Sequence, residues 1–431
     1  MGLKNFKITQ GSSWGHLFIF GFVVYALSMS DFSGAVEKIP YKLAWDNGII
    51  IEPGNKDALS IYRWSMTSNN DIPAERHRYA SLILLHANAV DLPKLEQGVP
   101  QRLTLPFKQV AQLTDFNTYG TAWSGSLLRL SGSMGPGRRH IAEVGPALLG
   151  GRVDGGKVSD LSQMAMVYTR TTVHSPEHME QRIMFGYIND KGQFVAGDKP
   201  LFAPDDPGVE ELGYDTSHTS KVIQAFRDPV YFKDPDGGEH LFFSAKYNAA
   251  YHDKTKIPGK FDPNRNSAIG HAKVKNGLWQ LMPPISTGTT AAQFELPSMV
   301  HHDGYYYCFV LEADWHYNTK DGNASKRLNT LKLYRSKTIA NGGQHWQPWG
   351  VLEKGKSTRS GTLLDLTGFE LPVYGVTVAQ YNGATYFSAF DDNVIDMLDL
   401  IRVGTADLVN DPQMGHKIIA AFRKTLHGEG S

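Results

Sequence analysis

From residue 37 onward, short runs of alternating aromatic and β-branched residues are separated by turns rich in glycine, asparagine and aspartate. Alternation with a period of two predicts strands with one buried face, and Asn-Gly or Asp-Gly between two such runs predicts a tight hairpin. Helical periodicity is scarce, and the best candidate helix is residues 418–426. The pattern therefore predicts an all-β protein. The hairpin turns are expected at residues 189–192, 236–238, 276–277, 303–304 and 382–383.

Three of these turns are followed by similar strands. Aligning the strands on Phe243, Phe309 and Phe387 gives intervals of 66 and 78 residues. A hairpin repeated at such a period is typical of the four-stranded blades of a β-propeller with long loops. Roughly 395 residues divided by this period predict a five-bladed β-propeller with a central active-site pocket.

Residues 1–36 differ from the rest of the chain. Lys4 and Lys7 precede an apolar run at residues 17–27, and small residues follow it. This order is typical of a secretory signal peptide, which predicts a secreted, extracellular protein. The alternative is a buried strand or helix of the mature fold.

No domain boundary is evident beyond this segment, so residues 37–431 are expected to form one five-bladed catalytic domain. The C-terminal helix is expected to cap its end. Long polar stretches are expected to be loops gathered on one face of the propeller, at residues 134–160, 203–220 and 250–266.

Charge and cysteine content exclude several classes of function. Lys+Arg and Asp+Glu both number 43, so no net positive charge attracts nucleic acid. The N-terminal apolar run is too short to span a bilayer comfortably, and we expect a monomer without nucleic-acid or membrane partners. Cys308 is the only cysteine, which excludes an intrachain disulfide and a cysteine-based metal site. Between Tyr307 and Phe309, it is expected to be a buried apolar residue of a strand.

Four short motifs bring acidic or polar side chains next to aromatic residues, arginine or proline. Two carboxyl groups can act together, one as nucleophile and one as proton donor, only if the fold brings them within about 5 Å of each other. Asp228 and Glu295 follow Asp46 by 182 and 249 residues, so they can meet only if the chain returns repeatedly to one axis. The innermost strands of propeller blades do this. In chain order the motifs are Trp45-Asp46, Trp123-Ser124-Gly125, Arg227-Asp228-Pro229 and Gln293-Phe294-Glu295-Leu296-Pro297.

In their order, and most closely at Arg-Asp-Pro, these motifs resemble those of glycoside hydrolase family 68, the levansucrase, inulosucrase and β-fructofuranosidase family. The resemblance implies a five-bladed propeller that transfers a fructosyl unit from sucrose or a related fructoside through a covalent intermediate. It implies Asp46 as the nucleophile, Glu295 as the acid/base and Asp228 as the stabiliser of the transition state. The choice between water and a sugar as acceptor stays open, as does the product linkage.

The resemblance also implies a binding site for the sugar around these acids. Arg227 is suited to bidentate contacts with hydroxyls or with a neighbouring carboxyl, and Gln293 matches a position that orients this arginine. The implied substrate-binding residues are Trp45, Trp123, Ser124, Arg227, Gln293 and Tyr374. No cofactor is expected. A structural calcium ion is compatible with the family, but the sequence assigns no ligands to it.

The chain departs from the family at three places. Asn47-Gly48 follows the nucleophile, Leu296 stands where the family has arginine, and Ala313-Asp314 falls where it has arginine or histidine. These positions lie toward the leaving group, so sucrose as donor is less well supported than fructosyl chemistry in general. Two alternatives stay open, another propeller glycosidase such as an arabinofuranosidase-like enzyme, and a non-catalytic fructoside-binding propeller. The second would not need Glu295 as an acid.

Overall fold

The structure is a computed structural model of the chain. It describes residues 43–54, 58–68, 80–89, 92–113, 121–129, 161, 164–171, 180–188, 194–197, 199–217, 225–276, 278–285, 287, 291–314, 328–339, 346–351, 359, 361–366, 373–392 and 394–427. These residues belong to one compact unit, residues 39–431. The predicted signal peptide at residues 1–36, the loop at 134–160 and the turn at 189–192 lie outside the described residues. Secretion therefore stays a prediction.

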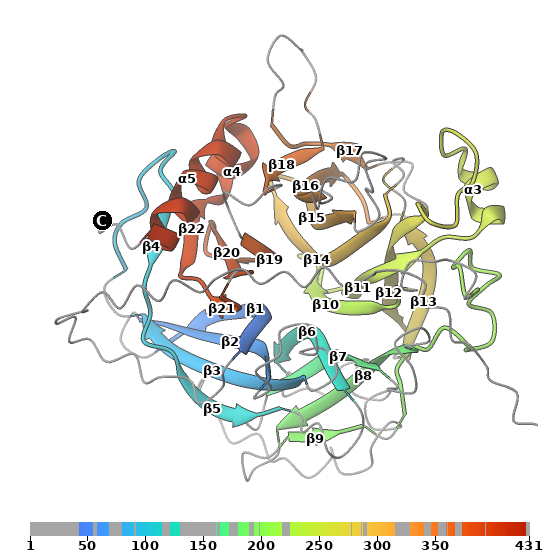
Figure 1. The fold of residues 1–431 in the computed structure, drawn as a ribbon, viewed down its shortest axis with the longest axis horizontal. Coiled ribbons are helices and arrows are strands. Elements are labelled where there is room, and N and C mark those ends of the chain that lie inside the picture. Colours follow the sequence, from blue (N-terminus) through green and yellow to red (C-terminus); the bar gives the residue numbers. More distant parts are fainter. Residues whose placement is uncertain are drawn as a thin grey trace, which may run out of the picture. The chain divides into compact units, whose positions relative to one another are not determined.

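Five antiparallel sheets are arranged as the blades of a β-propeller, as predicted (Figure 1). Blade 1 consists of β1 (Leu43–Pro53), β2 (Leu59–Ser68), β3 (Ser81–Ala89) and β5 (Lys108–Gln112). Blade 2 consists of β6 (Thr121–Arg129), β7 (Met164–Thr171), β8 (Gln181–Ile188) and β9 (Phe194–Ala196). Blade 3 consists of β10 (Arg227–Lys233), β11 (Glu239–Lys246), β12 (Ser267–Lys275) and β13 (Leu278–Ile285).

The last two blades each carry an additional short strand. Blade 4 consists of β14 (Gln293–His302), β15 (Tyr305–Asp314), β16 (Leu328–Ser336), β17 (Gln347–Pro348) and β18 (Thr362–Asp365). Blade 5 consists of β19 (Val373–Tyr381), β20 (Ala384–Asp391), β21 (Asp396–Met397), β22 (Leu400–Gly404) and β4 (Gln101–Leu103).

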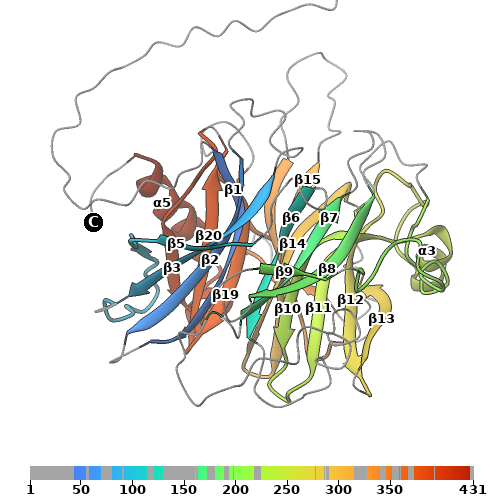
Figure 2. The same cartoon turned by 90° about the horizontal axis from the view of Figure 1, so that it is seen from below.

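The first strand of each blade lies innermost. β1, β6, β10, β14 and β19 each contact the next of these strands, and β19 contacts β1, so they form a closed ring around the centre of Figure 1. Figure 2 shows these strands from the side. A residue near the start of one inner strand therefore lies close to the starts of its neighbours. This is how a propeller brings residues far apart in sequence to one place.

Blade 5 is closed by a strand from the N-terminal part of the chain. β4 lies between β3 and β5 in sequence, but it pairs with β22. The same sheet thus contains a strand from the N-terminal part of the chain beside strands from the C-terminal part, and this pairing closes the ring. No local pattern in the sequence predicts this long-range pairing.

Two helices follow blade 5. α4 (Thr405–Asn410) and α5 (Met414–His427) end the described chain, and α5 contacts β18, β22 and β4. The helix predicted at residues 418–426 lies inside α5 and is confirmed. None of the described helices is long and apolar enough to cross a membrane.

The hydrophobic core is divided among the interfaces between neighbouring blades. One buried cluster joins blades 1 and 2, and others join blades 2 and 3, 3 and 4, 4 and 5, and 5 and 1. Cys308 belongs to the cluster between blades 3 and 4, and burial raises its pKa. Its predicted place inside a strand is confirmed.

Two of the predicted hairpin turns have the backbone that their residues favour. At Asp303-Gly304 and Asn382-Gly383 both residues have positive φ, as a type I′ turn requires. One predicted loop was wrong in part. Residues 250–266 begin within a short helix, α3 (Ala249–Thr255), because the side chain of Asn248 caps it by accepting from the Tyr251 amide.

Phe387 gives a direct test of this packing. The three aligned phenylalanines are fully buried, and the rings of Phe309 and Phe387 meet edge to face with centroids 6.2 Å apart, across the interface between blades 4 and 5. We expect Phe387→Ala to lower the free energy of unfolding by about 3–5 kcal/mol, measured in urea. Val394→Ala, at a residue that is 63% exposed, should change it by less than about 0.5 kcal/mol. Equal effects of the two substitutions would contradict this account of the core.

Candidate active site

Each inner strand has an irregularity close to its N-terminal end. The pairing register shifts between Trp45 and Asn47 in β1 and between Trp123 and Gly125 in β6. Corresponding shifts occur in the other three inner strands, at Arg227/Val230, Glu295/Ser298 and Tyr374/Thr377. A β-bulge re-aims side chains and is common next to active sites. The five bulges coincide with the positions that the sequence motifs single out.

The backbone at these bulges is unusual. Asp46, Asp228 and Leu296 have φ of 27°, 57° and 49°, and Gly375 has φ of 62°. Left-handed backbone at a residue other than glycine costs of order 1–3 kcal/mol, so the surrounding structure must hold it in place. Asp and Asn tolerate it better than other side chains. The same kind of distortion recurs in four of the five blades.

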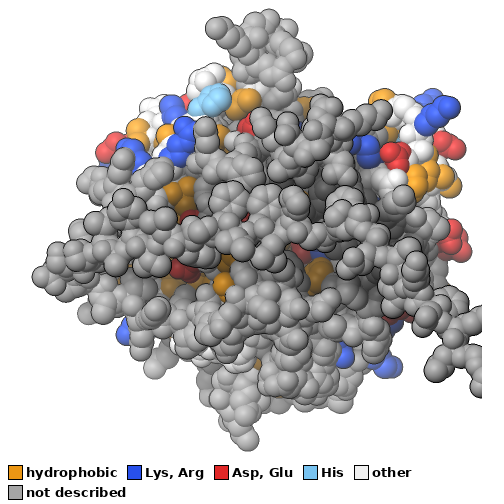
Figure 3. All heavy atoms as spheres, in the orientation of Figure 1, with side chains coloured by type: hydrophobic (Ala, Val, Ile, Leu, Met, Phe, Trp, Pro, Cys, Tyr) orange, Lys and Arg blue, Asp and Glu red, His pale blue; other side chains and the backbone are white. Residues whose placement is uncertain are grey.

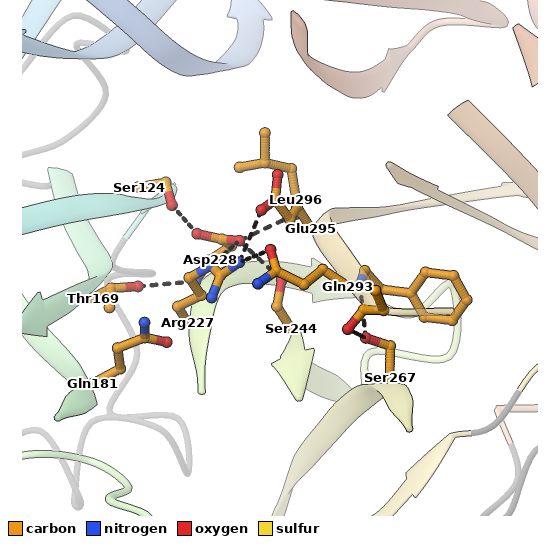
Figure 4. A network of polar contacts seen from close by, with 12 residues as sticks. Ser124, Thr169, Gln181, Arg227, Asp228, Ser244, Ser267, Gln293, Glu295 and Leu296 are labelled. Carbon is orange, nitrogen blue, oxygen red and sulfur yellow. Dashed lines mark hydrogen bonds and ion pairs between the residues drawn. The ribbon is translucent and has the colours of Figure 1, made fainter. Parts of the chain in front are cut away.

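Arg227 connects two of the predicted acids (Figure 4). Its Nη2 donates to Glu295 Oε1 at 2.8 Å and to Gln293 Oε1 at 3.0 Å, and its Nε lies 3.4 Å from Asp228 Oδ2. All four side chains are buried or nearly so. Gln293 therefore contacts the arginine that it is predicted to orient, and Asp228 and Glu295 are neighbours despite their separation in sequence.

Asp228 is held by hydroxyl and amide groups from three blades. Its carboxylate accepts from the hydroxyl of Ser124 in β6 and from Ser244 Oγ in β11 at 2.9 Å. The Leu296 amide lies 3.4 Å from Asp228 Oδ2, and the Asp228 amide donates to Thr169 Oγ1 at 2.8 Å. Burial raises the pKa of Asp228, the Glu295 charge adds to this, and Arg227 and the two hydroxyls oppose it.

Both carboxylate oxygens of Glu295 have partners. Arg227 donates to Oε1, and the Tyr374 hydroxyl donates to Oε2. Glu295 is 9% exposed. Glu295 is therefore held through both of its carboxylate oxygens, by side chains from blades 3 and 5.

Asp46 lies at the start of β1, half-buried, next to β19. A Cβ atom added to Gly375 would lie 3.0 Å from Asp46 Oδ1 and 2.6 Å from the Phe390 ring. Glycine at position 375 therefore leaves room for the Asp46 carboxylate. Acidic and hydrophobic side chains of described residues are visible near the middle of the face drawn in Figure 3.

Trp45 and Trp123 pack into the cluster between blades 1 and 2, and they are 0% and 8% exposed. Neither indole presents an open face to a sugar in this structure, so their role as a sugar platform stays a prediction. Among the described residues, no group of three or more His, Cys, Asp or Glu side chains is arranged to hold a metal ion.

Sequence reasoning missed Ser244, Thr169 and Gln181. Thr169 and Gln181 come from β7 and β8 and hold the start of β10, since Gln181 Oε1 accepts from the Phe226 amide at 3.0 Å. A signal existed for Ser244, since residues 243–245 and 387–389 both read Phe-Ser-Ala. Ser244 bonds to Asp228 itself, and Ser388 bonds to Asn47, the residue after Asp46.

Solved structures of levansucrases share this fold. A variant of B. subtilis levansucrase matches with a TM-score of 0.52 at 13% identity, over 83% of this chain and 82% of that one. A variant of B. megaterium levansucrase matches with a TM-score of 0.52 at 14% identity, over 81% of this chain and 79% of that one. A levansucrase variant crystallised with sucrose matches with a TM-score of 0.51 at 13% identity, over 87% of each chain. At this identity the likeness concerns the fold.

Comparisons of sequence alone add nothing to this likeness. No family model matches the chain, and no curated protein has a sequence significantly similar to it.

Proposed function

We propose that this protein is a retaining fructosyltransferase or β-fructofuranosidase that acts on sucrose or related fructosides. The observation that carries the proposal is the contact of Arg227 with both Asp228 and Glu295, at the end of the ring where β1 presents Asp46. The propeller fold shared with levansucrases supports it.

In the first step, a carboxylate oxygen of Asp46 attacks C2 of the fructosyl unit. The bond from C2 to the leaving oxygen breaks, and Glu295 gives its proton to that oxygen. Tyr374, which donates to Glu295 Oε2, would orient the carboxyl group for this transfer. The products of the step are the free leaving group and a fructosyl ester of Asp46.

In the second step, Glu295 is a carboxylate and takes a proton from water or from a sugar hydroxyl. The resulting oxygen nucleophile attacks C2, and the Asp46 carboxylate leaves. Asp228 forms no bond to the sugar carbon. Its buried carboxylate, fixed by Ser124, Ser244 and Arg227, would face the positive charge that develops on the ring.

The test is to incubate the purified protein with sucrose and to quantify glucose and fructose separately. We expect release of glucose, with equal fructose for hydrolysis and less fructose for transfer to a sugar. Levan, inulin and an aryl fructoside extend the test, because Leu296 and Ala313-Asp314 differ from the family on the leaving-group side. Binding of these sugars without turnover of any would contradict the proposal and favour a sugar-binding propeller.

A further inference from the structure

A second buried polar network lies directly behind Asp46. Asn47 is fully buried, and its Oδ1 accepts from Arg63 Nε at 3.2 Å, from Arg63 Nη2 at 3.1 Å and from the Ser388 hydroxyl. Its main-chain oxygen accepts from Thr377 Oγ1 at 2.8 Å. Three donors on one oxygen fix the orientation of the amide, because the flipped amide would turn a donor toward them.

Arg63 is itself 2% exposed. Besides Asn47, its guanidinium donates to the carbonyls of Leu398 and Ala389 in blade 5, both at 2.9 Å. None of these acceptors is a carboxylate. Burial lowers the pKa of Arg63 to about 9, and the more distant Asp399 and Asp396 oppose this shift, so the side chain is charged at neutral pH. Burying a cation without a bonded carboxylate is costly, and such a group calls for an explanation.

The network touches the chain on both sides of Asp46. Arg63 binds the residue that follows it, and Ser65, two positions along β2, donates to the main-chain oxygen of Trp45 at 3.0 Å. Asp46 is the extra residue of the bulge and has positive φ. A strained conformation persists only where its surroundings hold it, and here two side chains of β2 do so.

We infer that Arg63 is a positioning residue for Asp46, which acts by holding the neighbouring Asn47 and thereby the bulge. The inference rests on the proposed role of Asp46 as nucleophile. Arg63 has a second connection, to the carbonyls of blade 5, which could serve only to close the ring. The two roles are separable, because only the bond to Asn47 leads to Asp46.

Asn47→Ala separates them. This substitution removes the bond to Asn47 but leaves Arg63 bonded to Leu398 and Ala389. We expect kcat on sucrose, or on the fructoside that the wild type turns over, to fall about 10-fold to 100-fold with KM within about threefold, since a displacement of about 1 Å in a reacting group can cost 100-fold. Wild-type kcat in folded Asn47→Ala would overturn the inference.

Arg63→Gln removes both connections and should lower kcat at least as much. The matched control is Arg129→Gln. Arg129 lies in β6 of blade 2 and forms a bidentate pair with Glu52, which lies on β1 six positions beyond Asp46. The control should lose thermal stability but keep kcat within about twofold, because the Arg129–Glu52 pair lies roughly 20 Å along β1 from Asp46. Equal losses of kcat in Arg63→Gln and Arg129→Gln would mean a general structural effect and would also overturn the inference.

The inference about Arg63 can be tested separately from the proposed function. If the wild type turned over no fructoside, Asp46 would not be a fructosyl nucleophile, and the geometric part of the inference would be judged by crystallography. Crystal structures of the wild type and Asn47→Ala should then differ by about 1 Å at the Asp46 carboxylate. An unmoved Asp46 would overturn the inference whatever the enzyme does.

Discussion

Asp46→Asn is expected to abolish turnover, with kcat lowered by about 10⁴-fold or more, as for the loss of other covalent nucleophiles. The amide keeps the shape of the side chain but is a poor nucleophile. The fold should survive, because asparagine tolerates positive φ as well as aspartate does and Asp46 is only half-buried. The free energy of unfolding should change by less than about 1 kcal/mol.

The matched control for this variant is Asp234→Asn. Asp234 follows β10 at the end opposite Asp228 and accepts from the Tyr306 hydroxyl. This substitution should cost some stability and leave turnover intact. Activity like that of the wild type in Asp46→Asn would remove Asp46 from the mechanism.

Glu295→Gln is expected to lower activity in proportion to how much the leaving group needs a proton. On sucrose, whose leaving oxygen is an alkoxide unless protonated, kcat/KM should fall about 10²-fold to 10⁴-fold. On an aryl fructoside with an acidic phenol, kcat/KM, which reports the first step, should be nearly unaffected. The glutamine can still accept from Arg227, so binding should be largely kept.

Glu312→Gln provides the comparison. Glu312 is as buried as Glu295, and it pairs with Lys332 in β16 at 2.8 Å. Any loss of kcat/KM in Glu312→Gln should be the same on sucrose and on the aryl fructoside. Equal losses on sucrose and on the aryl fructoside in Glu295→Gln would assign Glu295 a positioning role in place of proton transfer.

The fold follows from local signals in the sequence. The turn at Asp303-Gly304 predicts a hairpin, and the strands aligned on Phe243, Phe309 and Phe387 predict a period that corresponds to five blades. These signals work because each hairpin is fixed by its own turn residues. The closing strand β4 was not predictable, since its pairing with β22 joins residues about 300 positions apart.

The candidate site was predictable in its members but not in its geometry. Arg227, Asp228, Gln293 and Glu295 stand out as motifs, and the structure joins them in one network. The bulges have no clear sequence signal, because Asp46 and Leu296 adopt positive φ without being glycine. The role of Arg63 has no sequence signal either, since an arginine in a strand is usually solvated and only the closed ring buries this one.

The central claim is a covalent fructosyl ester on Asp46, and mass spectrometry tests it most directly. Glu295→Gln should be mixed with an aryl fructoside, quenched rapidly in acid and digested. The phenol leaves without help from an acid, whereas the second step lacks its base, so the ester should accumulate. The account predicts the mass of one fructosyl unit on the peptide that contains Asp46. A burst of phenol with that peptide unmodified, or with the sugar on another residue, would contradict it.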